Sequence, residues 1–332
     1  MKRLVERLLD RIDLTRDEAG ELLAGLVSDD VSPELKAAAL TALRAKGETA
    51  EELAGIAHAM RARALNVDAP RDLPVVDTCG TGGDGKATIN VSTAAALVVA
   101  ATGRARVAKH GNRSVSSRSG SADVLEQLGV SIASTPPRAT RGLAEQGFAF
   151  LFAPGFHPAM ARLAPVRRAM GLRTVMNLCG PLTNPARPDR QIIGVYDEPA
   201  ARTIAHAMVH LGVARGLVVT GLGFDEATPC GPFLALHVSA EGVRESVIDP
   251  LDLGFARCAP EALAGGSPEE NASLLEGVLA GATGAQRDAV VLNAALALTL
   301  CDLAFEEARA IAEEAIDSGR ATALVSALRS AS

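Results

Sequence analysis

The residues best suited to bind a charged ligand lie in the segment DTCGTGGDGKATINVST, at positions 77–93. Four of its residues are glycines within six positions, and glycine allows positive φ angles and a close approach of backbone N–H groups to a ligand. The segment follows a short apolar run and leads into an apolar helix, whose N-terminus favours anions. Its spacing matches neither the dinucleotide-binding fingerprint nor a P-loop. We therefore predict a phosphate-binding loop, with a flexible connecting turn as the alternative.

Positive charge is concentrated directly after this loop. Residues 86–122 contain no Asp or Glu but carry six basic side chains: Lys86, Arg104, Arg106, Lys109, Arg113 and Arg118. In a chain of net charge −6, such a block favours a polyanionic ligand, although a solvated basic face is the alternative. The segment KHGNRSVSSRSGS (109–121) is rich in hydrogen-bond donors and poor in apolar residues. This composition is typical of a loop that wraps a ligand.

An acidic pair and one arginine are the other candidates. Asp225 and Glu226 follow the strand-like segment GLVVTG (216–221), and carboxylate oxygens suit Mg²⁺, which often bridges substrate phosphates. An ordinary acidic loop is the alternative for this pair. Arg167 lies beside Arg168 in the segment HPAMARLAPVRRAMG (157–171), and a guanidinium can hold a carboxylate through two parallel hydrogen bonds. For either arginine, a solvated helix residue is the alternative.

Two histidines lie close to these candidates in the sequence. His110 is inside the basic segment and could hydrogen-bond a second substrate, whereas a general-base role for it has little support from the sequence. His157 stands at the start of the helical segment 157–171, so we expect it to cap that helix.

The elements that must position these residues alternate along the chain. Apolar strand-like runs lie at 74–77, 105–109, 148–153, 191–196 and 216–221. Helical patterns separate most of them, at 92–103, 121–129 and 200–212. This alternation predicts an α/β fold with a mostly parallel central sheet flanked by helices. Two more apolar helices are expected at 290–300 and 305–319.

The chain outside this pattern predicts a smaller, all-helical domain. Residues 1–68 read as helices only, with Pro33 in a first turn, Gly47 as a C-cap and Thr49 as an N-cap. We expect residues 1–70 plus about 157–190 to form this domain. Residues 71–156 plus 191–332 then form the α/β domain that binds the phosphorylated ligand. The ligand cleft is expected where the two domains meet.

Composition excludes several classes of protein. A length of 332 residues suits about two domains, and 48% hydrophobic with 22% charged residues is typical of a globular protein. Aromatic residues make up only 3%, and the net charge is −6, which together disfavour binding to nucleic acid or to an anionic membrane. The charged N-terminal segment does not resemble a signal peptide, and we find no membrane-spanning segment. The five cysteines are widely spaced, without a CxxC motif, so we expect reduced thiols and a cytoplasmic location.

The motifs, taken in order, resemble those of the anthranilate phosphoribosyltransferase family. The resemblance runs from about residue 47 to near the C-terminus, through GTGGDG…TINVST, KHGNRSVSSRSGSADVLEQLG, HPAM…APVRR, NLCGPLTNPA, GFDE and GSPEENA…LNAA. Pyrimidine nucleoside phosphorylases share the second motif, but GTGGD combined with Asp225-Glu226 and GPLTNPA separates the two families. The chain departs from the usual family residues at four positions that we expect to support the site rather than contact ligand: Ile89, Met176, Thr220 and Phe224.

The resemblance implies a reaction and the residues that serve it. The expected activity is transfer of the 5-phosphoribosyl group from phosphoribosyl pyrophosphate to the amine of anthranilate in tryptophan biosynthesis, with release of pyrophosphate. Mg²⁺ is the implied cofactor, with two ions expected, and a homodimer is the implied assembly. Carried over by motif, the donor site comprises Gly80, Gly83, Asp84, Thr88, Asn90, Val91, Ser92, Thr93, Lys109, His110, Gly111, Asn112, Arg113, Ser114, Val115, Ser116, Ser117 and Ser121. The acceptor site comprises Gly80, Asn112 and Arg167, and the metal ligands are Ser92, Asp225 and Glu226.

Two rival functions remain at this point. A pyrimidine nucleoside phosphorylase would use phosphate rather than Mg²⁺ and would cleave nucleosides. A non-catalytic nucleic-acid-binding relative would need a broadly basic surface, which the net charge disfavours. No catalytic residue is assigned, and His110 is the one candidate for such a role.

Overall fold

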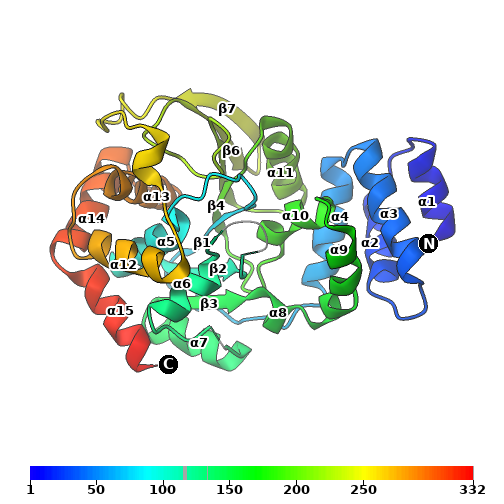
Figure 1. Cartoon of the computed structure of the whole chain (residues 1–332), viewed down its shortest axis with the longest axis horizontal. Coiled ribbons are helices and arrows are strands. Elements are labelled where there is room, and N and C mark those ends of the chain that lie inside the picture. The colour runs from blue at the N-terminus through cyan, green and yellow to red at the C-terminus, as the bar shows by residue number, and fades with distance from the viewer. Residues whose placement is uncertain (115–117, 133, 332) are drawn as a thin grey trace.

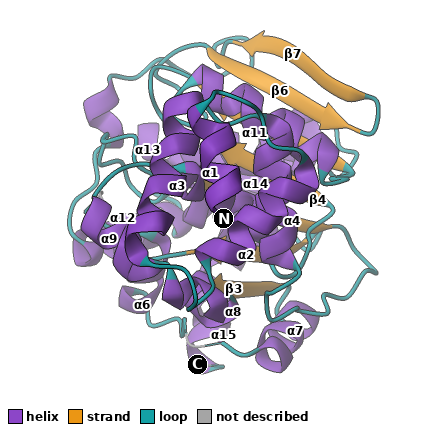
Figure 2. Ribbon diagram, turned by 90° about the vertical axis from the view of Figure 1, so that its right-hand side faces the viewer, coloured by secondary structure: helices purple, strands orange, loops and turns teal. Residues whose placement is uncertain are grey.

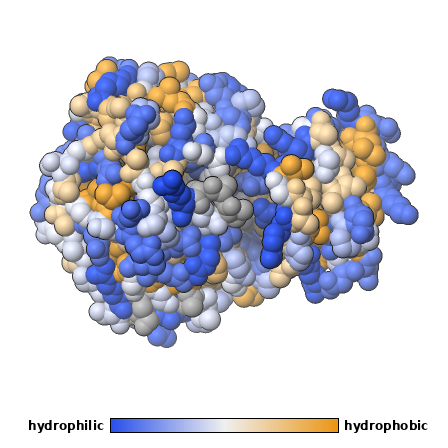
Figure 3. Space-filling model, viewed as in Figure 1, coloured by the Kyte–Doolittle hydropathy of each residue, from blue (hydrophilic) through white to orange (hydrophobic). Residues whose placement is uncertain are grey.

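A helical lobe stands beside an α/β body in the computed structural model, which describes residues 1–114, 118–132 and 134–331 (Figure 1). The N-terminus lies at the outer end of the helical lobe, and the C-terminus lies on the body. The surface narrows between the lobe and the body (Figure 3). Within the described ranges, no helix has the length and apolar character needed to cross a membrane.

The body is built on a sheet in the order β3-β2-β1-β4-β5-β6-β7. Its strands are β1 (Val75–Gly80), β2 (Arg106–Gly111), β3 (Phe148–Phe152), β4 (Arg190–Gly194), β5 (Arg215–Thr220), β6 (Phe233–Ser239) and β7 (Gly242–Ile248). All neighbours from β3 to β5 pair in parallel, so the five predicted strands and their parallel arrangement are confirmed. The last two strands pair antiparallel and were not predicted.

The hairpin of β6 and β7 forms one edge of the sheet (Figure 2). In β7, Arg244 and Glu245 are exposed, and Val247 is 72% exposed. An edge strand with one solvated face gives only a weak apolar signal in the sequence, and its charges discourage pairing with other chains. That is why the sequence did not reveal it.

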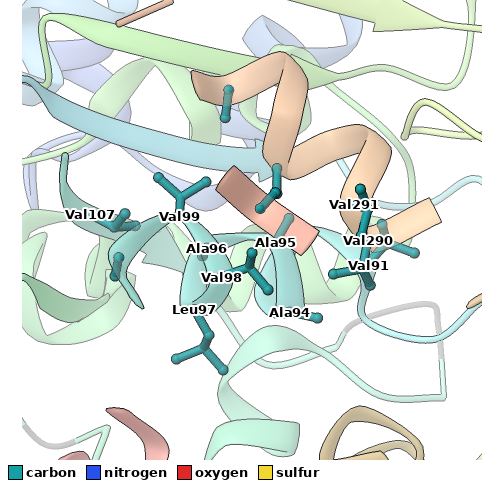
Figure 4. Close-up of a cluster of buried hydrophobic side chains, with 14 of the residues drawn as sticks. Val91, Ala94, Ala95, Ala96, Leu97, Val98, Val99, Val107, Val290 and Val291 are labelled. Carbon is teal, nitrogen blue, oxygen red and sulfur yellow. The ribbon is translucent and has the colours of Figure 1, made fainter. Parts of the chain in front are cut away.

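Both faces of the parallel strands are covered. Val76 and Leu217 belong to the apolar cluster on the side of α5 (Val91–Ala101), whereas Ile193 and Val218 belong to the cluster on the side of α11 (Glu198–His210). Strands buried on both faces consist of continuous apolar runs, and this is the pattern that made them recognisable. Helix α5 is buried nearly all round and packs against α13 (Ala285–Thr299), with Val91, Val290 and Val291 close together (Figure 4).

The helical lobe begins with four helices whose ends match their sequence signals. They are α1 (Lys2–Leu9), α2 (Arg16–Leu26), α3 (Pro33–Lys46) and α4 (Ala50–Arg61). Pro33 opens α3, Gly47 ends it with φ +94°, and Thr49 caps α4 in a capping box with Glu52, as predicted. One apolar cluster joins these helices to residues of the 163–182 segment and to side chains of β4, β5 and β6.

The segment 157–171, predicted as one helix, is two. A 3₁₀ turn covers Pro158–Arg162, and α9 covers Ala164–Met170. Pro165 explains the break, because a proline inside a helix lacks a donor and clashes with the preceding turn but fits a first turn. The predicted cap is also wrong: His157 occupies the N-cap position, but its side chain makes no capping hydrogen bond.

The remaining helices lie around the sheet and in the lobe. They are α6 (Ser121–Gln127), α7 (Pro136–Glu145), α8 (Ala153–Phe156), α10 (Val175–Cys179), α12 (Pro268–Leu279), α14 (Phe305–Asp317) and α15 (Arg320–Ser330). The two predicted C-terminal helices correspond to α13 and α14, while α12 and α15 were missed. The cysteines are free thiols, and the Sγ atoms of Cys230 and Cys258 lie 3.5 Å apart despite their separation in sequence.

Candidate active site

Three segments converge where the parallel strands end. Gly80 and Gly194 close β1 and β4 and pair with each other in register, while the loop after β5 crosses them with Asp225. A Cβ atom on Gly80 would lie 2.3 Å from Asp225 Oδ2, and one on Gly194 would lie 1.6 Å from the Asp225 carbonyl oxygen. Only glycine allows this approach. The acidic loop therefore rests directly on the carboxyl edge of the sheet, where ligands of open α/β sheets bind.

The acidic pair is held by groups of the glycine-rich loop and of α5. The backbone N–H of Gly82 donates to Asp225 Oδ2 at 2.7 Å. Glu226 accepts the Ser92 N–H at 3.3 Å and the Thr88 hydroxyl at 3.4 Å. The start of α5 thus already faces a carboxylate, in keeping with the preference of helix N-termini for negative charge.

The electrostatics of the pair indicate an excess of negative charge. Burial, followed by the charge of Asp84, raises the pKa of Asp225 to about 7. Burial, followed by the charges of Asp225 and Asp84, raises the pKa of Glu226 well above its ordinary value. A nearby cation would favour the ionised forms of Asp225 and Glu226.

These residues suit a magnesium ion that is bound partly by protein and partly by water and substrate. They do not suit a metal ion held by protein ligands alone. Among residues 1–114, 118–132 and 134–331, no group of three or more His, Cys, Asp and Glu side chains is arranged to hold a metal ion. A small cavity of about 10 Å³ is nevertheless lined by Ser92, Asp225 and Glu226. Mg²⁺ usually takes one or two carboxylates and completes its shell with water and substrate phosphates. The two carboxylates and the Ser92 hydroxyl suit that role.

The glycine-rich loop has the backbone geometry that its sequence predicted. Gly82, Gly83 and Gly85 have φ angles of +69°, +77° and +72°. The predicted donor-site residues at the start of α5 differ in what they offer. Val91 and Thr93 are fully buried, so their side chains belong to the core, whereas Asn90 binds the Ser119 carbonyl at 3.1 Å instead of capping the helix.

Lys109 lies under the site rather than in the loop above it. The segment 109–111 is part of β2, so the predicted ligand-wrapping loop begins only at Asn112. Lys109 is 1% exposed, and its ammonium donates to the Thr78 carbonyl at 2.5 Å and to the Ser92 hydroxyl at 3.4 Å. Burial lowers the pKa of Lys109, opposed by the surrounding carboxylates, with Asp77 the first of them. Lys109 therefore contributes one buried amine beside the acidic pair.

His110 is neutral and offers one unused acceptor. Its Nδ1 lies 3.2 Å from the Gly180 carbonyl, which can only accept, so Nδ1 carries the proton. Its Nε2 is buried and has no partner within the described structure. Burial, followed by the charge of His157, lowers the pKa of His110 to about 3, and the two rings meet edge-on at 5.2 Å.

The rest of the predicted wrapping loop is described only in part. Val115, Ser116 and Ser117 lie outside the described residues. Arg113 forms ion pairs with Asp123 at 3.0 Å and Glu126 at 2.6 Å, so its charge is already paired. Ser114 donates its N–H to Asp123 at 3.0 Å, and Ser121 donates its hydroxyl to the Asn112 carbonyl at 3.2 Å. Gly111 is needed here, because a Cβ atom would lie 2.3 Å from Ser121 Oγ.

Arg167 and its neighbour Arg168 differ in burial. Arg167, on α9, is half-buried and forms no ion pair among the described residues, and burial lowers its pKa. Arg168 is exposed. An unpaired, partly buried guanidinium is a suitable partner for a carboxylate ligand.

Sequence reasoning missed two residues of the site. Gly194 lies inside the predicted strand 191–196, where nothing marks it as part of a site. Arg173 donates to the Gly83 carbonyl and lies over the Tyr196 ring at 4.4 Å, so it ties the helical lobe to the glycine-rich loop. Nothing in the sequence distinguishes Arg173 from the other arginines of its segment. The four positions that depart from the family's usual residues are all buried: Ile89, Met176, Thr220 and Phe224.

Comparison with known proteins identifies the family. Residues 72–322 match the α/β domain of a glycosyl transferase family, and residues 2–64 match the helical bundle domain of a glycosyl transferase family. An anthranilate phosphoribosyltransferase of Natronomonas pharaonis is 47% identical over 332 residues, covering 99% of each chain. The chain belongs to the anthranilate phosphoribosyltransferase family.

Solved structures of this family have the same fold. The Thermus thermophilus enzyme superposes with a TM-score of 0.92 at 43% identity, covering 99% of this chain and 98% of that one. The Saccharomyces cerevisiae enzyme, in complex with PRPP and Mg, has a TM-score of 0.90 at 28% identity, with coverage of 99% and 96%. It has also been solved with 4-fluoroanthranilate. The expected fold, an α/β domain with a smaller helical domain, is confirmed.

Proposed function

We propose that this chain transfers the 5-phosphoribosyl group of phosphoribosyl pyrophosphate to the amine of anthranilate, in the tryptophan pathway, and releases pyrophosphate. The observation that carries the proposal is the acidic pair Asp225-Glu226, which lies on the sheet edge against the glycine-rich loop. The names of relatives that match nearly the whole chain agree with this activity. They favour the transferase over a nucleoside phosphorylase or a nucleic-acid-binding protein.

The donor site is proposed at the carboxyl edge of the sheet. N–H groups of the glycine-rich loop, with Gly80, Gly83, Asp84 and Thr88, would bind its phosphates and ribose. Ser92, Asp225 and Glu226 would hold Mg²⁺, two ions in our proposal, and bound Mg²⁺ supplies charge neutralisation for the departing pyrophosphate. Positive φ angles and the absence of side chains at the glycines support this assignment.

The acceptor site is proposed between this edge and the helical lobe. Arg167 would hold the carboxylate of anthranilate. Gly80 and Asn112 would contact the rest of the anthranilate molecule. His110 would accept a hydrogen bond from the aryl amine at Nε2, which orients the nitrogen lone pair toward C1 of the ribose. The neutral, Nδ1-protonated ring leaves Nε2 free to accept a hydrogen bond, and because Nε2 is buried in this structure, substrate binding would have to open a path to it.

The bond changes need positioning more than a strong base. The amine nitrogen forms a bond to C1 while the bond from C1 to the pyrophosphate oxygen breaks, and the reacting carbon inverts through an oxocarbenium-like state. The nitrogen then loses a proton. With a pKa of about 3, His110 cannot keep that proton at neutral pH, so it passes to water or to a phosphate oxygen. His110 is therefore a hydrogen-bond acceptor for the amine rather than its final base.

Assembly, location and domain limits are further parts of the proposal. Leu9 and Ile12, at the end of α1, are 67% and 46% exposed, which supports a homodimer formed through the helical lobe. The division into residues 1–70 plus 157–190 and residues 71–156 plus 191–332 is supported by the packing of α9 and α10 against α3 and α4. A cytoplasmic location agrees with the five free thiols.

The deciding experiment measures pyrophosphate release. Purified protein with phosphoribosyl pyrophosphate and Mg²⁺ should release pyrophosphate rapidly only when anthranilate is added, and removal of Mg²⁺ by a chelator should stop it. Phosphorolysis of uridine or thymidine with phosphate should be absent. Phosphorolysis without anthranilate-dependent pyrophosphate release would show that the protein is a nucleoside phosphorylase and not the proposed transferase.

A further inference from the structure

A second cavity, of about 350 Å³, lies where the helical lobe meets the α/β body. Its walls come from the end of α4, from residues 187–189 before β4, and from the 211–214 turn between α11 and β5. Residues 187–189 precede β4 and residues 211–214 precede β5, so the cavity lies at the N-terminal ends of these strands. The acidic pair lies at the opposite, C-terminal ends. The two cavities share no lining residue. Helices α4 and α11 pack against each other beside it (Figure 1).

Two arginines face this cavity without a carboxylate partner. Within the described ranges, neither Arg61 nor Arg187 forms an ion pair, and Arg61 donates only its Nε, to the Leu182 carbonyl at 2.7 Å. Asp189 also lines the cavity, but it accepts the Val75 N–H at 2.9 Å and is paired with a neighbouring arginine. Burial, followed by the charge of Arg187, lowers the pKa of Arg61 to about 10. The cavity therefore holds two guanidinium groups that form no ion pair in the described part of the chain, and one carboxylate, Asp189, whose partners are other groups.

The backbone at Arg187 is held in an unfavourable conformation. Its φ is +47°, in the left-handed region that residues other than glycine rarely adopt. Its N–H donates to the Asn184 carbonyl at 3.1 Å, and its carbonyl accepts from Arg71 at 3.2 Å. Strained residues of this kind persist where the surrounding structure fixes them, and they concentrate at binding sites.

We propose that this cavity binds a small organic anion, with a carboxylate or phosphate between Arg61 and Arg187 and an apolar body against Leu211 and Val213. A cavity of this volume holds a small molecule, and guanidinium groups bind both kinds of oxyanion through paired hydrogen bonds. Since the walls belong to both the helical lobe and the body, the ligand would join the two at a place remote from the acidic pair. The inference is independent of the proposed reaction.

The test is isothermal titration with two probes, 4-methylpentanoate and n-butyl phosphate, which contain neither an aromatic ring nor a sugar. Wild-type protein should bind at least one probe saturably, and the stronger probe tells a carboxylate site from a phosphate site. Arg187→Gln should weaken this binding by roughly ten- to a hundredfold, the loss expected for a hydrogen bond to a charged group.

The matched control is Arg63→Gln, because Arg63 is exposed at the same helix end but does not line the cavity. It should bind the probes as the wild type does. Arg187→Gly provides a second variant, since glycine suits the positive φ and preserves the fold. No saturable binding by wild-type protein at tens of millimolar probe, or equal affinity in the wild type and both Arg187 variants, would overturn the proposal.

Discussion

Replacing Gly194 by alanine tests whether the close contact at the sheet edge positions the metal-binding loop. The new Cβ atom would lie 1.6 Å from the Asp225 carbonyl oxygen, and ordinary contacts begin at 3.4 Å. The loop that carries the acidic pair must therefore move by about 1.8 Å. A displacement of 1 Å at a reacting centre costs about a hundredfold in rate, so we expect kcat/KM to fall by at least ~100-fold. Overpacking should cost about 1–3 kcal/mol in the free energy of unfolding, which leaves the protein folded.

The assay is the initial rate of pyrophosphate release at varied Mg²⁺, with thermal unfolding followed by circular dichroism. The Mg²⁺ concentration needed for half-maximal rate should rise in the variant. Gly155→Ala is the control, because nothing lies within 4 Å of its added Cβ atom, and its rate and stability should stay close to wild type. A folded Gly194→Ala protein with wild-type rate and Mg²⁺ dependence would show that the position of the loop does not matter to catalysis.

Three further predictions concern other parts of the site. Arg167→Ala should raise the KM for anthranilate by roughly ten- to a hundredfold, whereas exposed Arg168→Ala should stay near wild type; equal KM values in steady-state kinetics would exclude Arg167 as the carboxylate partner. Asp225→Asn combined with Glu226→Gln should lower Mg²⁺-dependent turnover by at least ~100-fold in a folded protein, and an unchanged Mg²⁺ titration would remove both from the metal site. Burial lowers the pKa of His157 to about 4, so below pH 6.5 the unfolded chain binds more protons than the native protein. The free energy of unfolding should therefore fall by about 2 kcal/mol from pH 7 to pH 5 through this residue, and urea titrations of His157→Gln should show a correspondingly smaller fall.

The parts of the fold that the sequence predicted are those in which one local pattern decides the structure. The parallel strands are buried on both faces, so each appears as an apolar run, and the caps at Gly47 and Thr49 depend on the residue type at a single position. The segment 157–171 was predicted to be helical, and the structure divides it before α9, because Pro165 fits only the first turn of a helix. The β6–β7 hairpin was missed because its outer strand faces water.

The site residues likewise fall into those that a local sequence pattern predicts and those that depend on tertiary contacts. The glycine-rich loop and the acidic pair could be placed together, because both follow strands of one parallel sheet, and the carboxyl ends of such strands share an edge. The role of Gly194 depends on how closely a loop some thirty residues later approaches it, and that of Arg173 depends on contact between the lobe and the body. Lys109 was predicted both as the last residue of a strand and as the first residue of the ligand-wrapping loop, but it lies inside β2, with its ammonium beneath the loop. Such contacts are tertiary and leave no local signal.

The apolar cluster of the helical lobe has a consequence for biosynthesis. It joins residues as far apart as Leu4 and Val238, so the apolar cluster shared by the lobe and the body is incomplete until the chain has been made through β6. At roughly 5–20 residues per second, the ribosome needs on the order of ten to thirty seconds to travel from the end of α4 to β6. During that interval α1 to α4 can pack against one another, but the part of the cluster that Val218, Leu236 and Val238 complete stays open. The newborn chain is therefore a natural client for chaperones that bind apolar segments near the ribosomal exit, and slowing translation before β6 should increase its aggregation.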